Sequence, residues 1–272
     1  MRARLGQKME NAPRAQRGAF CFGRAQVLSG ADAENLGMME NRKAACGRFV
    51  LRLMPEAMLM NVHFTFVRHG ETDWNIDRRL QGHLDVPLNE VGRRQAEQVA
   101  EALANERFDA IYSSDLSRAM DTARAIAARC GGEVQGTERL RERNYGIFQG
   151  LTHKEGAARY PAEHARLMAR EPDHIPTEGG ESMRMFSERI RTLADELATR
   201  WPDGRVLVVT HGGVLYALRN FITGAGLSAP RDFTIPNAGI NRIRYRVGGP
   251  YEIEVWGDDR HLTAAGRDET MR

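Results

Sequence analysis

A short apolar segment of this chain passes directly into a basic, turn-forming triplet. Residues 62–67, Val-His-Phe-Thr-Phe-Val, are rich in β-branched and aromatic side chains, which is typical of a buried strand. Arg68, His69 and Gly70 follow at once, and a glycine lets the backbone turn sharply just past a strand end. Open α/β sheets bind their ligands outside the carboxyl ends of the strands. The segment therefore predicts a sheet with a cation and an imidazole side by side at its carboxyl edge.

Strand-like and helix-like patterns alternate along the rest of the chain. Apolar residues three and four positions apart indicate helices, whereas short apolar or alternating runs indicate strands. In chain order these patterns predict a helix capped by Asn89, strand 109–113, helix 117–129, a strand end and loop over 140–145, a short helix capped at Thr152, a second short helix ending at Arg170, helix 183–197, strand 205–210, helix 214–222, and strands 242–247 and 251–255. The alternation predicts an α/β fold, a three-layer sandwich with a mostly parallel central sheet flanked by helices.

Three of the predicted strands lead into residues suited to binding an anion. The first ends at Arg68-His69, the second is followed by Arg118, and the third ends at Thr210-His211. Parallel strands share one carboxyl edge, so we expect these arginine and histidine side chains to converge there. Arg118 would lie in the first turn of a helix, where free backbone N–H groups also favour an anion. Two guanidinium groups and two imidazoles around one pocket suit a dianionic phosphoryl group.

The string Arg68-His69-Gly70-Glu71-Thr72-Asp73-Trp74-Asn75 resembles the signature of the histidine phosphatase superfamily, which includes the cofactor-dependent phosphoglycerate mutases. Further matches follow in the family's order: Ser113 to Arg118, Glu142-Arg143-Asn144-Tyr145-Gly146, and Thr210-His211-Gly212-Gly213. The resemblance covers residues 61 to about 256. It implies a phosphoglycerate mutase-like fold.

The resemblance also implies a role for each matching side chain. His69 matches the nucleophile that becomes phosphorylated, His211 the second pocket histidine, and Glu142 the proton donor of the mutase-like branch. The other matches are the two phosphate-clamping arginines and the residues that line the phosphate and substrate site, namely Arg68, Arg118, Asn75, Gln81, Gly82 and Gly212.

The chemistry of these residue types agrees with the implied roles. A neutral imidazole nitrogen can attack phosphorus in line and form a phosphohistidine. A guanidinium beside it, such as that of Arg68, disfavours the imidazolium form. Because arginines can stabilise the charge on the equatorial oxygens, we expect neither a metal ion nor another cofactor. Glu142 could protonate the leaving alkoxide and then deprotonate the attacking water.

Two other interpretations of these residues are weaker. His69 and His211 could be a metal-binding pair, but metal sites usually recruit carboxylates or further histidines, and arginines flank these two. Glu142 lies in the charged run 138–143, which by itself indicates a solvent-exposed face.

These observations predict a metal-independent phosphomonoesterase that acts on a small phosphorylated metabolite. The alternative is a 2,3-bisphosphoglycerate-dependent phosphoglycerate mutase. Such mutases carry an adjacent arginine pair, in a Trp-Arg-Arg-Ser-Tyr type of element, between the positions of Tyr145 and Glu181. Here the segment reads Ala165-Arg166-Leu167-Met168-Ala169-Arg170, without that pair. A third alternative, a non-catalytic module that binds phospho-ligands, would need the pocket without a nucleophile or an acid, yet both are present.

Composition separates the first 60 residues from the rest. They carry ten Lys/Arg and five Asp/Glu, a charge of +5, so residues 61–272 carry −2 of the chain's net +3. We predict that residues 1–60 are a poorly ordered basic extension or the product of a mis-assigned start, with Met58 or Met60 as the true start. A transit peptide is a weaker interpretation because the segment is poor in serine. Residues 61–272 would form the histidine phosphatase domain.

The remaining composition limits the partners and the location. The charge is not clustered as nucleic-acid binding requires, and no run of about 18 uncharged apolar residues could span a membrane. The three cysteines, Cys21, Cys46 and Cys130, share no metal-ligand spacing and indicate reduced thiols in the cytoplasm. We therefore expect no nucleic-acid or membrane partner, and leave a homodimer open.

Overall fold

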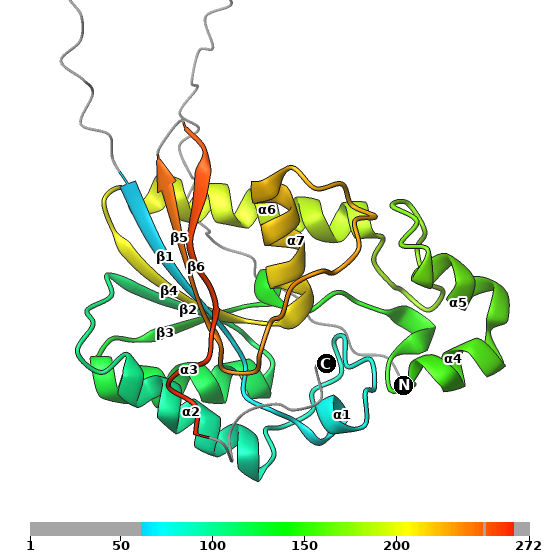
Figure 1. Cartoon of the computed structure of the whole chain (residues 1–272), viewed down its shortest axis with the longest axis horizontal. Helices are drawn as coiled ribbons and strands as arrows, with labels where there is room; N and C mark the ends of the chain where they lie inside the picture. Colours follow the sequence, from blue (N-terminus) through cyan, green and yellow to red (C-terminus); the bar gives the residue numbers. More distant parts are fainter. Residues whose placement is uncertain (1–60, 247–248, 264–272) are drawn as a thin grey trace, which may run out of the picture. The chain divides into compact units, whose positions relative to one another are not determined.

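The computed structural model describes residues 61–246 and 249–263. The predicted extension, residues 1–60, lies outside the described residues, as do residues 264–272 of the predicted domain. Figure 1 shows the helices and strands of the described part. In chain order they are β1 (Asn61–Arg68), α1 (Asp73–Ile76), α2 (Glu90–Ala102), β2 (Ala110–Ser114), α3 (Ser117–Cys130), β3 (Val134–Thr137), the 3-10 helices η1 (Glu138–Leu140) and η2 (Gly146–Phe148), α4 (His153–Arg159), α5 (Pro161–Met168), α6 (Met183–Arg200), β4 (Arg205–Thr210), α7 (Gly212–Thr223), β5 (Ile240–Arg246) and β6 (Tyr251–Asp258).

Within the described residues, six strands form one sheet in the order β3-β2-β4-β1-β5-β6. The four strands β3, β2, β4 and β1 are parallel; at one side β5 is antiparallel to β1, and β6 is antiparallel to β5. The predicted mostly parallel sheet and the predicted pair of C-terminal strands are both confirmed. In β4 the core residues alternate between the two faces, because successive side chains of a strand point to opposite sides.

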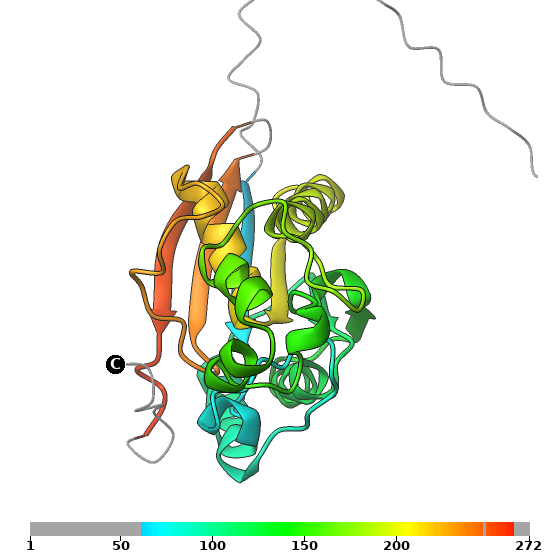
Figure 2. The same cartoon turned by 90° about the vertical axis from the view of Figure 1, so that its right-hand side faces the viewer.

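Two apolar clusters make the layers on either side of the sheet. Val206 and Val208 of β4 pack with α6 and α7 on one face, whereas Leu207 and Val209 pack with α2 and α3 on the other. Figure 1 shows these two helix pairs on opposite sides of the strands. Figure 2 looks toward the end of the sheet where the short helices α4 and α5 lie in front. The predicted three-layer sandwich is confirmed.

The helix starts follow local capping chemistry. The Asn89 side chain accepts a hydrogen bond from the Gly92 amide at 2.7 Å and begins α2, as predicted. Thr152 and Glu155 form the predicted capping box of α4, with each side chain bonded to the other residue's backbone. Ser182 caps α6 through the Met185 amide. The predicted start of each of these helices is therefore confirmed.

One strand was missed, and one prediction was wrong. β3 has the sequence Val-Gln-Gly-Thr and is not buried at any position, so it shows neither an apolar run nor alternation. Among the described strands it lies at the edge of the sheet and pairs only with β2. The predicted strand end at Leu140 is instead the last residue of η1, and an irregular loop follows it through Tyr145.

Candidate active site

The register of the central strands places the predicted residues together. Arg68 pairs with Thr210 across β1 and β4, so His69 and His211 follow one residue later on neighbouring strands. Their ring centroids are 5.1 Å apart. Arg118 comes from the first turn of α3, just after β2, which pairs with β4 on its other side. These four side chains line one cavity of about 630 Å³.

The sharp turn after β1 depends on a close approach of two backbones. A Cβ atom added at Gly70 would lie 2.3 Å from the Gly92 carbonyl oxygen, and one at Gly92 would lie 2.0 Å from the Glu71 carbonyl oxygen. Both distances are shorter than any normal contact, so the first turn of α2 packs directly against the turn that carries His69. The Gly70 amide also donates to the Thr122 hydroxyl of α3 at 3.1 Å.

His69 is held in one tautomer. Its Nδ1 lies 2.6 Å from the Gly70 carbonyl oxygen, and only a protonated nitrogen can donate to a carbonyl. The free lone pair is therefore on Nε2. The side chain is 3% exposed, and burial, followed by the charges of Arg118 and Arg68, holds its pKa well below the usual value. His69 is a neutral base with its lone pair available.

His211 is fully buried and also neutral. Burial, then the neighbouring Arg118, His69 and Arg68, hold its pKa well below the usual value. Neither ring nitrogen has a hydrogen-bond partner within the described part of the chain. A buried polar group without a partner is costly, so a bound ligand that supplies one would be stabilised there.

Backbone carbonyls fix the two arginines. Arg68 Nη1 donates to the Ile235 carbonyl at 2.6 Å. Arg118 Nη1 and Nη2 donate to the Leu84 and Gly82 carbonyls, each at 2.9 Å. Burial lowers the Arg118 pKa to about 10, so the group stays charged at neutral pH. Arg118 is fully buried and donates to neutral carbonyls, so its charge favours an anion beside it.

Glu142 faces the same cavity from the loop after η1. Its Oε1 accepts from the Arg143 amide at 2.7 Å, and its Oε2 accepts from the Gly213 amide at 2.8 Å in the first turn of α7. A Cβ atom at Gly213 would lie 2.0 Å from Oε1, so a side chain at this position would displace the Glu142 carboxylate. The charged run 138–143 therefore does not present Glu142 to bulk solvent.

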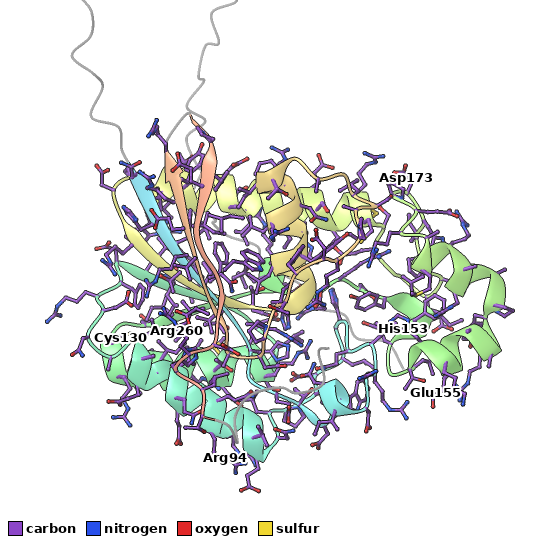
Figure 3. All side chains as sticks on the ribbon, viewed as in Figure 1. Arg94, Cys130, His153, Glu155, Asp173 and Arg260 are labelled. Atoms are coloured by element: carbon purple, nitrogen blue, oxygen red, sulfur yellow. The ribbon has the colours of Figure 1, made fainter. Side chains whose placement is uncertain are left out.

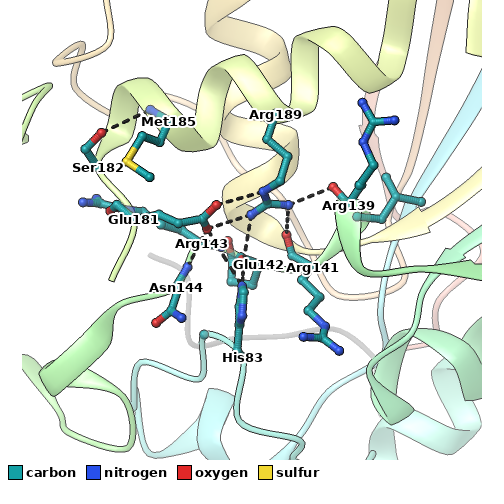
Figure 4. Close-up of polar contacts among 12 residues, drawn as sticks. His83, Arg139, Arg141, Glu142, Arg143, Asn144, Glu181, Ser182, Met185 and Arg189 are labelled. Carbon is teal, nitrogen blue, oxygen red and sulfur yellow. Dashed lines mark hydrogen bonds and ion pairs between the residues drawn. The ribbon is translucent and has the colours of Figure 1, made fainter. Parts of the chain in front are cut away.

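Arg189 of α6 holds the loop that carries Glu142, as Figure 4 shows. Its Nε and Nη2 bind the two carboxylate oxygens of Glu181 at 2.9 and 2.8 Å. Its guanidinium also donates to three carbonyls of the loop, those of Arg139, Arg141 and Glu142, at 2.8, 3.1 and 3.3 Å. His83 Nε2 donates to the same Glu142 carbonyl at 2.9 Å. The sequence reasoning missed this clamp because its parts are far apart in the chain.

The other predicted residues lie at or near the cavity. Asn75 lines it, and its side chain completes the capping box of α1 with Thr72. Gln81 lines it and donates to the Thr72 hydroxyl at 2.8 Å. Gly212 lines it beside Arg68. Gly82 is not a lining residue and acts through its carbonyl, which accepts from Arg118.

The cavity is strongly basic. Among the described residues that line it, seven are arginines and one, Glu142, is a carboxylate. The five arginines that the sequence reasoning did not assign to the site are Arg78, Arg79, Arg143, Arg170 and Arg231. Arg143 could have been found as the neighbour of Glu142, whereas Arg231 has no local signal. His153 of α4 also lines the cavity. Cys130, the last residue of α3, is not a lining residue (Figure 3).

This arrangement can bind a phosphoryl group and transfer it. A neutral imidazole nitrogen, two fixed guanidinium groups, Gly212 of the first turn of α7 and the Glu142 carboxylate line the same cavity. Across residues 61–246 and 249–263, His, Cys, Asp and Glu side chains nowhere gather in threes that could hold a metal ion. None of the helices in those ranges combines the length and apolar character needed to cross a bilayer.

Most of the chain is similar in sequence to known proteins. The profile of the histidine phosphatase superfamily (branch 1) matches residues 64–259. Phosphoglycerate mutase-like protein 4 of Arabidopsis thaliana is 42% identical over 202 residues, which cover 74% of this chain and 86% of the relative. A metal-independent phosphoserine phosphatase of the same plant is 41% identical, covering 74% of this chain and 83% of the relative. The solved structure of a mycobacterial glucosyl-3-phosphoglycerate phosphatase is 34% identical with a TM-score of 0.65, covering 73% of this chain and 100% of that chain.

Proposed function

This chain belongs to the histidine phosphatase superfamily, and on that premise we propose that His69 is the nucleophile of a metal-independent phosphomonoesterase. One observation carries the assignment. The Gly70 carbonyl fixes the proton on Nδ1, so the Nε2 lone pair of a neutral, buried imidazole is available beside two guanidinium groups. The substrate is a small phosphorylated metabolite.

The proposed reaction has two steps. His69 Nε2 attacks phosphorus in line, the P–O bond to the leaving group breaks, and Glu142 gives the leaving oxygen a proton. Water then attacks the phosphorus of the phosphohistidine, Glu142 takes a proton from that water, the P–N bond to His69 breaks and returns its electron pair to Nε2, and inorganic phosphate leaves. Arg68, Arg118 and His211 bind the phosphoryl oxygens, with Asn75, Gln81 and the Gly212 amide around them. The fixed arginines supply the charge that a metal ion supplies in other phosphatases.

A mutase is the second candidate, because one relative carries the name phosphoglycerate mutase-like. The segment 165–170 argues for the phosphatase. Arg170 lines the cavity, but Arg166 is exposed and bonds to Glu171 at 2.7 Å. The segment therefore offers one cavity arginine where the mutases place an adjacent pair. A cytoplasmic location and a homodimer stay predictions.

The test uses the purified full chain in EDTA. We expect the protein to hydrolyse p-nitrophenyl phosphate and to carry an acid-labile phosphate that maps to His69. When 2,3-bisphosphoglycerate is added, we expect no conversion of 3-phosphoglycerate to 2-phosphoglycerate. His69→Ala should lower turnover to below a few per cent, because the imidazole is the nucleophile. His63→Ala is the matched control, since His63 is exposed and lies at the other end of β1.

Three results would contradict the proposal. They are substantial activity in His69→Ala, loss of activity in EDTA that Mg²⁺ or Zn²⁺ restores, and efficient mutase turnover without phosphate release.

A further inference from the structure

Two histidines that the proposed reaction does not use lie side by side. His153 is the first residue of α4, and His164 lies in the middle of α5. One residue, Tyr160, joins the two helices, because α4 ends at Arg159 and α5 begins at Pro161. The helices contact each other, and Figure 1 shows them beside one another. The short connection therefore makes a helix hairpin that brings the two histidines together.

A close approach of the two helices holds this pair. A Cβ atom added at Gly156 would lie 3.2 Å from Cδ2 of His164, so the glycine lets α5 come near to α4. Gly156 is three residues after His153 and therefore lies on the same face of α4. The His164 ring also meets the Phe148 ring edge-on, with the centroids 6.0 Å apart. The His164 ring is thus packed where the first turn of α4 faces it.

The two imidazoles present nitrogen atoms to each other. Nδ1 of His153 and Nε2 of His164 lie 3.3 Å apart, with the ring planes at 66°. A normal N–H···O hydrogen bond is about 2.9 to 3.0 Å long, so this contact is a long one. Two nitrogens that bind one tetrahedral zinc ion, each at about 2.0 to 2.1 Å, are separated by about 3.3 Å. The nitrogens therefore stand at the separation that a shared metal ion requires.

The surroundings of the pair also suit a cation. His153 is exposed, so an ion can reach the pair from solvent. Partial burial of the ring, followed by the charge of His164, lowers the pKa of His153, and the neutral imidazole is the form that binds metal. Glu155 of the same α4 bonds to Arg79 at 2.8 Å and offsets the charge of that cavity arginine.

We propose that His153 and His164 form a binding site for a divalent transition-metal ion such as Zn²⁺, with water in the remaining coordination positions. Imidazole nitrogen suits Zn²⁺, Ni²⁺ and Cu²⁺, whereas Mg²⁺ and Ca²⁺ prefer oxygen ligands. On binding, each facing nitrogen gives its lone pair to the ion, and the proton between the rings moves to the far nitrogen of the ring that carried it.

Such an ion would join two helices of the cavity wall. One ligand comes from α4 and the other from α5, and His153, Leu167 and Met168 of these helices line the cavity. The ion therefore links the two helices at the edge of the candidate active site. The proposed reaction does not need this ion, so the site and the catalytic proposal can fail independently.

Zinc titration of the purified full chain, with reduced thiols and without chelator, tests the site. Calorimetry should show a Zn²⁺ ion bound in a way that excess Mg²⁺ does not prevent. His153→Gln and His164→Gln should each weaken this binding by about 10-fold or more, because each removes one of the two protein ligands. Zn²⁺ should also raise the melting temperature of the wild type, since a ligand that binds the folded chain stabilises it, and both variants should lose most of that shift.

Two control variants locate the ion. His69→Ala disrupts the other pair of neighbouring histidines, and His63→Ala removes an exposed histidine of β1, so both should bind Zn²⁺ as the wild type does. Zinc affinity that neither glutamine variant changes, or that His69→Ala abolishes, would overturn the proposal. Nitrogen NMR of the wild type needs no substitution. Zn²⁺ should shift the imidazole signals of two histidines, and a shift of fewer than two would also overturn it.

Discussion

A single backbone contact sets the chemistry of His69. In a flexible or exposed position the imidazole would sample both tautomers and protonate near neutral pH. Here the Gly70 carbonyl selects one tautomer, and burial with two neighbouring cations keeps the ring neutral. The same cations would bind the phosphoryl oxygens, so the groups that bind the substrate also keep the nucleophile unprotonated.

The proton donor can be tested by changing the leaving group. An acid matters most for a basic alkoxide and least for an activated aryl oxide. Glu142→Gln should lower turnover of an alkyl phosphate by about 10² to 10⁴, and that of p-nitrophenyl phosphate clearly less. His211→Ala, which removes a binding group, should lower both turnovers to a similar degree.

Equal losses on both substrates in Glu142→Gln would show that another group delivers the proton. Glu71 is a poor substitute although it lies two residues after His69. It accepts from the Asn89 side chain at 2.9 Å and is not among the cavity-lining residues.

At the scale of elements, α6 positions the loop that carries Glu142. Arg189 and Glu181 form a bidentate pair, and the same guanidinium binds the loop carbonyls. Both partners are less than one-fifth exposed, so water screens their interaction less than that of a surface pair. The clamp holds the backbone of the loop, whereas the Arg143 and Gly213 amides hold the Glu142 carboxylate itself, so both sets of contacts position the carboxyl.

Arg189→Leu should therefore act through Glu142. We expect kcat for an alkyl phosphate to fall about 10-fold, with a smaller loss for p-nitrophenyl phosphate, because the acid is displaced from the leaving oxygen. In a Glu142→Gln background the same substitution should have little further effect. Arg191→Leu is the control on α6, since the Arg191 side chain is exposed and pairs with Asp195. Additive losses in the double variant would indicate a general structural role for Arg189.

At the scale of the whole molecule, the sheet brings distant segments to one edge and buries them. β4 pairs with β1 and β2, so strands separated by more than 90 residues end together. The result is a cavity with two fully or nearly fully buried histidines and two buried arginines. Such a site costs stability, because the histidines cannot take up the proton that they bind in the unfolded chain.

This cost predicts how stability depends on pH. His69 and His211 have folded-state pKa values well below 6.5, so the unfolded chain binds more protons as pH falls below that value. The free energy of unfolding should fall from pH 7.5 to 5.5, by about 1.4 kcal/mol per buried histidine at pH 5.5.

Thermal unfolding at the two pH values checks this expectation. His211→Asn should reduce the pH-dependent difference, and His63→Asn, at an exposed position, should retain it. An unchanged difference in His211→Asn would mean that His211 is protonated in the folded protein.

The residues next to strand ends could be predicted from the sequence, because their chemistry and their strand lie in one short segment. This holds for Arg68-His69-Gly70, for Arg118 after β2 and for His211-Gly212 after β4. The layered α/β fold followed for the same reason, since apolar periodicity is local. The strand β3 could not be predicted from its sequence, because it lies at the edge of the described sheet, is not buried at any position and shows no apolar pattern.

Contacts between distant segments were decided only by the tertiary structure. Nothing local to Glu142 indicates that the Gly213 amide binds its carboxylate, or that Arg189 holds its loop. Arg170 and Arg231 lie 61 positions apart, yet both line the cavity, and the Ser228 hydroxyl donates to the Arg170 carbonyl. A sequence pattern specifies which side chains a segment exposes, whereas long-range packing specifies which of them face one another.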